Sequence, residues 1–130
     1  MNLRKIGWLG TRTDQPELMA DFFGRVLGIR LDTRVADDFW VFQLPDGSKV
    51  EVFGPRSHNQ HFTTGPVPGF LVHNVDAATE ELRAAGIPIV SGPTRGEGDD
   101  DEAWVHFRGP DGNIYEITQG RDLEEIVRSP

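Results

Sequence analysis

The 130-residue chain carries thirteen Lys and Arg against twenty-one Asp and Glu, giving a formal net charge of −8, and 37% of its residues are hydrophobic. This length predicts one domain, residues 1–130, and the negative charge argues against nucleic acid or an anionic membrane as partner while favouring a cationic ligand. The sequence shows no membrane-spanning run, no signal-peptide core and no cysteine, which excludes thiolate chemistry and predicts a cytoplasmic protein.

The first half of the chain predicts the element order β-α-β-β-β. A strand over residues 6–11 precedes a helix that begins at Asp14, with Pro16 in its first turn, and ends at Gly28. Three strands follow, over residues 29–33, 39–44 and 49–53, the last two joined by a Pro-Asp-Gly turn. The apolar side of the helix is expected to hold residues at helical spacing, namely Leu18, Phe22 and Val26, widened by Met19, Phe23 and Leu27.

The second half repeats this order after a connector, residues 54–66, that contains His58 and His61. Strands are expected over 68–74, 87–90, 104–108 and 114–119, with a helix that begins at Asp76 and ends at Gly86. The repeat is clearest where Pro-Asp-Gly-Ser-Lys-Val-Glu-Val, residues 45–52, matches Pro-Asp-Gly-Asn-Ile-Tyr-Glu-Ile, residues 110–117. Glu51 and Glu116 therefore occupy the same place in two modules, about 4–54 and 67–119. The tail, 120–130, is either a short docking helix or a frayed end.

Strand periodicity predicts which side chains share a cavity. Side chains alternate between faces with period two, and Val105, Phe107, Phe70 and Val72 form the apolar sides suited to helix packing. The first strands are expected to turn Gly7, Leu9, Thr11 and, in the second module, Gly69, Leu71 and His73 to the other side. The expected cavity wall comprises Glu51, Glu116, His73, Trp104, His106, Arg108 and Phe39. The alternative is an exposed sheet face on which Arg108 pairs with Glu116 across strands.

Two βαβββ modules that end in Asp-Gly-Asn-Ile-Tyr-Glu resemble the vicinal oxygen chelate superfamily of glyoxalase I, bleomycin-resistance proteins and extradiol dioxygenases. The motifs that carry the resemblance lie at 107–116 (FRGPDGNIYE), 22–28 (FFGRVLG) and 69–78 (GFLVHNVDAA). The resemblance implies an α+β fold, in which the two modules form a curved mixed sheet around a cavity. It also implies a homodimer. It leaves the activity open, because one fold carries many chemistries.

The resemblance also bears on metal binding. In metal-dependent members the ligands come from the first and last strands of each module, and the last-strand carboxylates match Glu51 and Glu116. The first-strand ligand is commonly a histidine, but the matching positions, seven residues before Asp14 and Asp76, hold Gly7 and Gly69. Two carboxylates make a poor divalent-metal site, so no metal or other cofactor is expected. A non-standard metal set completed by His61 or His106 is the alternative.

Three classes of function remain open. The first is a metal-free protein that binds a cationic or aromatic small molecule, in the manner of bleomycin-resistance proteins, with Phe39, Trp104 and the acidic run 97–102 near its site. The second is a lyase, isomerase or dioxygenase acting on a vicinal-oxygen substrate. In that enzyme Glu51 and Glu116 would be metal ligands, or one of them would be the general base, and His106 or Arg108 would stabilise the oxyanion. The third is a structural or partner-binding module. If the protein is a binding protein, the first of these classes, Glu51, His73 and His61 are expected to contact the ligand together with the aromatic residues.

Overall fold

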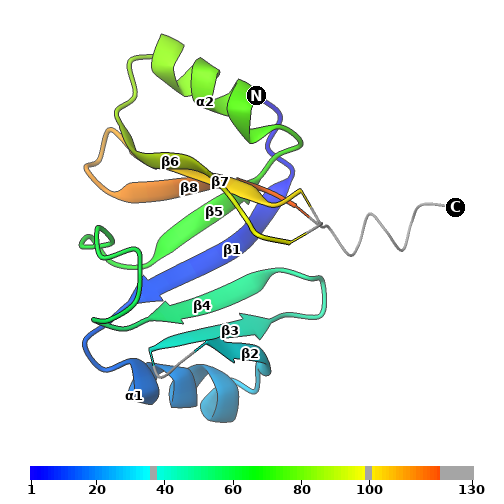
Figure 1. The fold of residues 1–130 in the computed structure, drawn as a ribbon, viewed down its shortest axis with the longest axis vertical. Coiled ribbons are helices and arrows are strands. Elements are labelled where there is room, and N and C mark those ends of the chain that lie inside the picture. Colours follow the sequence, from blue (N-terminus) through cyan, green and yellow to red (C-terminus); the bar gives the residue numbers. More distant parts are fainter. Residues whose placement is uncertain (36–37, 99–100, 121–130) are drawn as a thin grey trace, which may run out of the picture.

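The computed structural model describes residues 1–35, 38–98 and 101–120, and within them eight strands form one mixed sheet. The order across the sheet is β2-β3-β4-β1-β5-β8-β7-β6. The strands are β1 (Lys5–Arg12), β2 (Arg30–Val35), β3 (Phe39–Gln43), β4 (Lys49–Phe53), β5 (Val67–Leu71), β6 (Ile89–Arg95), β7 (Ala103–Arg108) and β8 (Ile114–Gln119). The predicted α+β fold with two βαβββ modules is confirmed (Figure 1).

The two modules join through their first strands. β1 pairs antiparallel with β5, while β1 pairs parallel with β4 and β5 pairs parallel with β8. The last strand of each module therefore lies one strand away from the junction. The register sets Glu51 beside Gly10 and Glu116 beside Gly69, so the two glutamates flank the middle of the sheet.

The helices lie at the two ends of the row of strands (Figure 1). The helix α1 (Pro16–Asp21) continues into a π-helical turn, η1 (Phe22–Val26), and α2 (Val75–Ala84) belongs to the second module. On α2, Val75, Ala78 and Leu82 pack against Val105 and Ile117 of the sheet. The equivalent cluster in the first module comprises Ala20, Phe23, Trp40, Phe42, Val50 and Val52. Because these clusters cover one face of the sheet, the other face is left for a pocket.

Both predicted helix starts were wrong. The N-cap of α1 is Gln15, and Asp14 instead forms an ion pair with Arg12 at 2.8 Å. The N-cap of α2 is Asn74, whose side chain accepts a hydrogen bond from the Ala77 backbone N–H at 3.0 Å. An asparagine side chain caps as well as an aspartate, so the capping residue could not be chosen from residue type.

The helices end where the glycines predicted, but the first helix buries a different side from the predicted one. Gly28 and Gly86 have φ of 73° and 77°, the left-handed backbone that glycine tolerates. Leu18, Phe22 and Val26, expected to face the sheet, are exposed. The buried side instead runs through Ala20 and Phe23, with Met19 packed against them. The helix is thus rotated relative to the prediction.

A β-bulge in β1 changes which of its side chains face the pocket. The pairing with β5 shifts register between Ile6 and Trp8. Beyond the bulge, Trp8 lies on the pocket side, whereas Leu9 packs in the helix-side cluster. The prediction that Leu9 faces the cavity was therefore wrong, because strict alternation fails where a strand holds one extra residue.

Two further expectations concern the second module. β6 spans Ile89–Arg95, so the strand predicted over 87–90 began too early and ended too soon. The docking helix predicted in the tail lies outside the described residues, as do residues 99 and 100 of the acidic run. Among the helices that the structure describes, none is long and apolar enough to cross a membrane.

Candidate functional site

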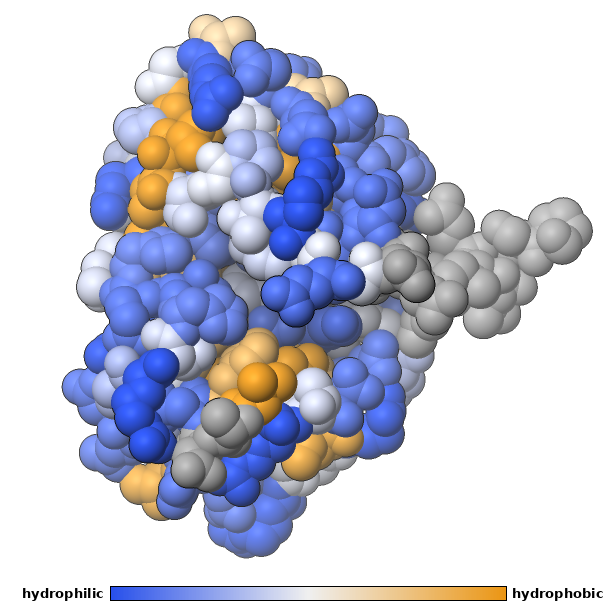
Figure 2. All heavy atoms as spheres, in the orientation of Figure 1, coloured by the Kyte–Doolittle hydropathy of each residue, from blue (hydrophilic) through white to orange (hydrophobic). Residues whose placement is uncertain are grey.

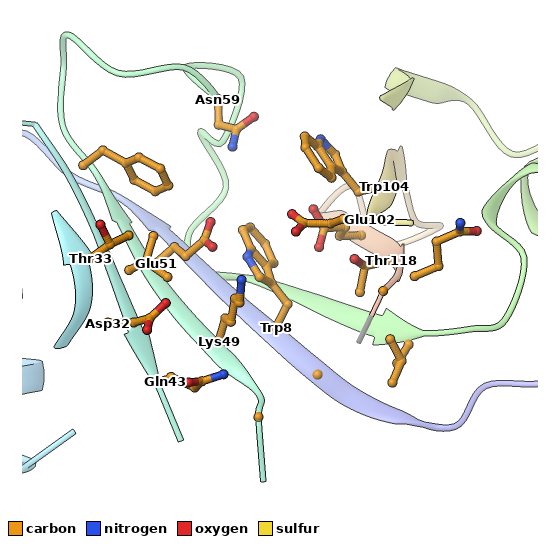
Figure 3. Close-up of a pocket in the computed structure, with 18 of the residues that line it drawn as sticks. Trp8, Asp32, Thr33, Gln43, Lys49, Glu51, Asn59, Glu102, Trp104 and Thr118 are labelled. Atoms are coloured by element: carbon orange, nitrogen blue, oxygen red, sulfur yellow. The ribbon is translucent and has the colours of Figure 1, made fainter. Parts of the chain in front are cut away.

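A pocket of about 460 Å³ lies on the face of the sheet opposite the helices. Both modules line it, since its walls include residues of β1 to β5, β7 and β8 and of the connector. Glu51 and Lys49 approach the pocket from one side and Glu102, Trp104 and Thr118 from the other, with Trp8 between them (Figure 3). The other lining residues are Gly7, Asp32, Thr33, Val35, Phe39, Val41, Gln43, Gly47, His58, Asn59, Leu71, Glu116, Gln119 and Gly120.

Glu51 lies on β4 as a half-buried carboxyl that is costly to ionise. Burial raises the pKa of Glu51 to about 7, and the negative charge of Glu102 acts in the same direction. A hydrogen bond from Trp8 and the positive charge of Lys49 oppose the shift without cancelling it. A carboxyl with such a pKa exchanges its proton near neutral pH.

Glu116 lies on β8 and is only 3% exposed. Its Oε1 is joined by a hydrogen bond of 2.8 Å to Nε2 of His106, which lies directly opposite on β7. Burial, followed by the charges of Glu51 and Glu102, raises the pKa of Glu116 well above its ordinary range. Burial and these negative charges therefore favour the protonated form of Glu116.

His106 links Glu116 to a second histidine on the side away from the pocket. It is 1% exposed, and its Nδ1 lies 2.9 Å from Nε2 of His61 in the connector. Its ring packs against Phe62, 4.9 Å between ring centroids, and stacks on Trp8 at 6.5 Å. Burial, with smaller effects of His61 and His58, lowers the pKa of His106 to about 3. The imidazole is therefore neutral at physiological pH.

The register makes the two glutamates unequal. The residue opposite Glu116 on β7 is His106, whereas the residue opposite Glu51 on β3 is Val41. Glu51 instead receives its hydrogen bond from Trp8. The two carboxyls of the repeat therefore differ in their neighbours: Glu116 has an imidazole beside it, and Glu51 has an aliphatic side chain and an indole.

Aromatic rings form a second feature of the pocket. Phe39 stacks on Phe53 with 4.9 Å between centroids, and His58 meets both rings edge-on at about 5 Å. Trp8 and Trp104 line the pocket elsewhere. Such rings offer flat surfaces to an aromatic or cationic group.

The charges around the pocket are mostly negative. Asp32, Glu51, Glu102 and Glu116 line it, and Lys49 is the one lysine or arginine among the lining residues. The face of the molecule drawn in Figure 2 is largely hydrophilic, with apolar patches among the charged side chains. A ligand that brings a positive charge would meet complementary charge here.

The structure brings together most of the residues predicted from the sequence. Glu51, Glu116, Phe39 and Trp104 line the pocket. His106 and His61 lie behind Glu116, joined to it through hydrogen bonds.

Two predicted residues lie elsewhere. His73 is exposed, in the turn between β5 and α2, and does not line the pocket. Arg108 is exposed at the end of β7, where it donates a hydrogen bond to the Gly112 carbonyl at 2.6 Å. The cross-strand pair of Arg108 with Glu116 does not form, because Arg108 lies opposite Ile114 in the register.

Sequence reasoning missed several residues of the site. The sequence did not single out Trp8, which alternation with Gly7 and Leu9 leaves on the opposite face and which the bulge in β1 brings into the pocket. Asp32 and Lys49 were not singled out, and Glu102 was expected near the site only as part of the acidic run 97–102. His58, which the sequence analysis assigned only to the connector, lines the pocket. For Lys49, its position two residues before Glu51 on the same strand was a usable signal, because such residues share a face.

The donors around the two glutamates do not fit a divalent-metal centre. The register places Gly10, rather than the expected Gly7, beside Glu51, and Gly69 beside Glu116. A Cβ on Gly69 would lie 2.7 Å from Oε2 of Glu116, so a larger side chain has no room there. Both ring nitrogens of His106 are already hydrogen-bonded. Within the described residues, no three His, Asp or Glu side chains are grouped so that they could hold a metal ion.

The fold defines a two-module protein with a pocket between its repeats. Residues 5–117 match the family model of the Glyoxalase/Bleomycin resistance protein/Dioxygenase superfamily, and the chain belongs to this superfamily. No curated protein matches the sequence.

Solved structures share the fold at low sequence identity. An Mn(II)-bound glyoxalase from Novosphingobium aromaticivorans has a TM-score of 0.70 at 19% identity, covering 93% of this chain and 42% of that one. A superfamily member from Vibrio splendidus 12B01 has a TM-score of 0.65 at 19% identity, covering 91% and 99%. Methylmalonyl-CoA epimerase from Mycobacterium tuberculosis has a TM-score of 0.65 at 17% identity, covering 97% of each chain. These likenesses show a common fold alone.

Proposed function

We propose that the protein binds a small organic molecule that combines a positive charge with a flat aromatic part, and that it does so without a metal. The observation that carries the proposal is the juxtaposition of four carboxyl groups, those of Asp32, Glu51, Glu102 and Glu116, with the rings of Trp8, Trp104 and Phe39 in one pocket. Carboxylates and aromatic faces are the two groups that attract a flat cation.

The size of the pocket supports this class of ligand. Its volume of about 460 Å³ lies within the roughly 300–1,000 Å³ of pockets that take small organic molecules. Lys49 neutralises only part of the negative charge of the lining. A bound cation would supply the missing countercharge and would relieve the repulsion that raises the pKa of Glu116.

The donor set supports the metal-free part of the proposal. Glycine stands beside each glutamate, and the hydrogen bonds of His106 occupy both of its nitrogens. A ligand would therefore be recognised by charge, hydrogen bonding and ring contact.

Isothermal titration calorimetry with a matched set of probes tests the proposal. The probes are an aromatic cation (N-methylquinolinium), a neutral ring (quinoline), an aliphatic cation (tetramethylammonium) and an aromatic anion (1-naphthoate), so they separate the effect of charge from that of the ring. The same titrations with protein treated with EDTA test whether binding needs a metal. The expected order of affinity is aromatic cation, then aliphatic cation or neutral ring, with the anion weakest. Glu51→Gln should weaken the cation and spare quinoline, while Glu80→Gln, an exposed change on α2, serves as control. No binding across the set, preference for the anion, or loss of binding after EDTA would refute the proposal.

A second candidate is an enzyme that moves a proton at a carbon next to a carbonyl, as a lyase or isomerase would. The observation that favours it is the pair of carboxyls with raised pKa that line one pocket from equivalent strands, since a base with a pKa near 7 suits proton abstraction at neutral pH. Glu116 or Glu51 would take the proton, and Lys49 is the cation placed to stabilise an oxyanion. Arg108 lies away from the pocket.

Solvent-deuterium exchange into a panel of 2-substituted carbonyl compounds, followed by NMR, tests this candidate. Glu116→Gln should abolish exchange and keep ligand binding. Exchange that persists in this variant would eliminate Glu116 as the catalytic base.

The proposal places the protein in the cytoplasm as a homodimer. The exposed apolar side chains Leu18, Phe22 and Val26 on one helix are the observation that supports an interface. Light scattering that gives the mass of a single 14.5 kDa chain at working concentrations would contradict the dimer.

A further inference from the structure

A continuous chain of hydrogen bonds leads out of the pocket. Oε1 of Glu116 lies 2.8 Å from Nε2 of His106, and Nδ1 of the same imidazole lies 2.9 Å from Nε2 of His61. The three groups come from β8, β7 and the connector. Glu116 lines the pocket, whereas His61 is half-exposed and does not line it. The chain therefore has one end at the ligand site and the other near solvent.

Two arrangements of protons satisfy this chain without moving a heavy atom. When Glu116 is protonated, its O–H donates to Nε2 of His106, and Nδ1–H of His106 donates to Nε2 of His61, which carries its own proton on Nδ1. When Glu116 is ionised, Nε2–H of His106 donates to the carboxylate, and Nε2–H of His61 donates to Nδ1 of His106. Both imidazoles are neutral in each arrangement.

The two arrangements differ by one proton. On passing from the first to the second, the Glu116 proton moves to Nε2 of His106, the Nδ1 proton of His106 moves to Nε2 of His61, and the Nδ1 proton of His61 leaves to water. We propose that Glu116, His106 and His61 form a proton relay that exchanges the proton of the pocket carboxyl with solvent on the connector side.

The surroundings favour a relay over a buried ion pair. His106 is enclosed by Trp8, Phe62 and the ring of His61. Burial lowers the pKa of His106 to about 3, and burial followed by His58 lowers that of His61. The charged groups that act on Glu116 are Glu51 and Glu102, both negative. They favour a neutral carboxyl, so a protonated His106 beside an ionised Glu116 is the costlier state.

The relay matters most when the pocket is full. Glu116 is only 3% exposed in the free protein, and a bound ligand would cover the pocket side of its carboxyl as well. A cation that needs an ionised Glu116 can then expel the proton only through His106 and His61. This consequence rests on the proposed function, but the relay itself is a property of the free protein.

NMR of the free, 15N-labelled protein tests the relay. The chain has four histidines, and the 15N shifts of their rings distinguish the two neutral tautomers from the doubly protonated ring. We expect His106 to change from the Nδ1–H to the Nε2–H tautomer with the same midpoint as the Glu116 carboxyl carbon. A tautomer that is the same on both sides of that midpoint would overturn the relay. A doubly protonated His106 beside an ionised Glu116, or a Glu116 that stays protonated up to high pH, would do so too.

Two variants sharpen the test. His61→Phe should slow exchange between the two forms by about 10²-fold, the low end of what a positioned acid or base contributes. His73→Phe, the same substitution at an exposed position outside the chain, should leave the rate unchanged. An unaltered rate in His61→Phe would count against the relay.

Should His61→Phe fail to fold, Glu116→Gln gives an independent reading, because an amide cannot release the proton. There His106 should keep one tautomer over the range in which the wild type switches, and a tautomer that still switches would overturn the relay. None of these titrations needs a ligand, so they can succeed even if the calorimetric probes fail to bind, and the two proposals stand or fall separately.

Discussion

Replacing Glu51 with glutamine should make the protein more stable at alkaline pH and leave it unchanged at acidic pH. Burial raises the pKa of Glu51 from 4.5 to about 7, so the folded state holds a proton that the unfolded state releases at lower pH. Stability therefore falls as pH rises from about 4.5 to about 7, the reverse of the usual carboxylate case. Glutamine has the same shape, keeps an oxygen that can accept from Trp8, and never ionises.

The magnitude follows from the shift. At about 1.4 kcal/mol per pKa unit, a rise from 4.5 to about 7 costs the folded state about 3.5 kcal/mol in full, and about 2 kcal/mol once solvent at this half-buried carboxyl is allowed for. The charge of Glu51 also raises the pKa of Glu116, so its removal acts in the same direction there. Glu51→Gln should thus gain about 10 °C in melting temperature above pH 8.

Urea unfolding followed by tryptophan fluorescence, at six values between pH 4 and pH 9, measures this difference. The gain of Glu51→Gln over the wild type should be near zero at pH 4 and reach its full size above pH 7. Glu17→Gln, at an exposed position on α1, controls for the loss of one negative charge. A difference that is constant with pH would refute the reasoning, since it would show that Glu51 titrates at its ordinary pKa when folded.

Four further predictions follow from the same geometry. The affinity for N-methylquinolinium should rise between pH 6 and pH 8, because Glu51 must lose its proton to face a cation; calorimetry that shows a fall would contradict this. Trp8→Phe removes the hydrogen bond that lowers the pKa of Glu51, so the Glu51 carboxyl should titrate at a higher pH by 13C NMR, and an unchanged midpoint would deny that bond. Gly69→Ala places a Cβ 2.7 Å from Oε2 of Glu116 and should lower the free energy of urea unfolding by about 1–3 kcal/mol. Gly7→Ala, whose nearest neighbour is the Leu71 Cβ at 3.5 Å, should lower it less. Equal losses would show that the close approach at Gly69 is relieved. Ile117→Ala empties part of the helix-side core, where the side chain is 2% exposed, and should lower the free energy of unfolding by about 2–5 kcal/mol. Ile6→Ala, at a side chain that is 59% exposed, should lower it by less than about 0.5 kcal/mol. Equal losses would contradict the assigned core.

The sequence was sufficient for the order of the elements and for the faces of the last strands. β4 and β8 begin and end where alternation and the Pro-Asp-Gly turns predicted. These strands are regular, and a pattern of period two carries their orientation directly. Phe39 and Trp104 were placed on the pocket side for the same reason.

What failed depended on features that no local pattern carries. The bulge in β1 is visible only in the pairing with β5, and it moves Trp8 into the pocket. The helix start at Asn74 rather than Asp76 is a choice between two good capping residues. The link from His61 to His106 joins residues 45 positions apart, and it depends on the path of the connector.

The inequality of the two glutamates is the point at which fold and chemistry meet. An exact repeat would give two equivalent carboxyls, and two like charges in one low-dielectric pocket would hold each other protonated. The chain breaks the symmetry at the neighbouring positions, with Val41 opposite Glu51 and His106 opposite Glu116. Glu51 keeps a pKa of about 7 and can ionise at neutral pH, so it is suited to meet a cation first. The pKa of Glu116 is also raised, and this carboxyl has an imidazole through which to release its proton. The repeated fold thus supplies the two glutamates, and the residues opposite them on the neighbouring strands make their chemical properties different.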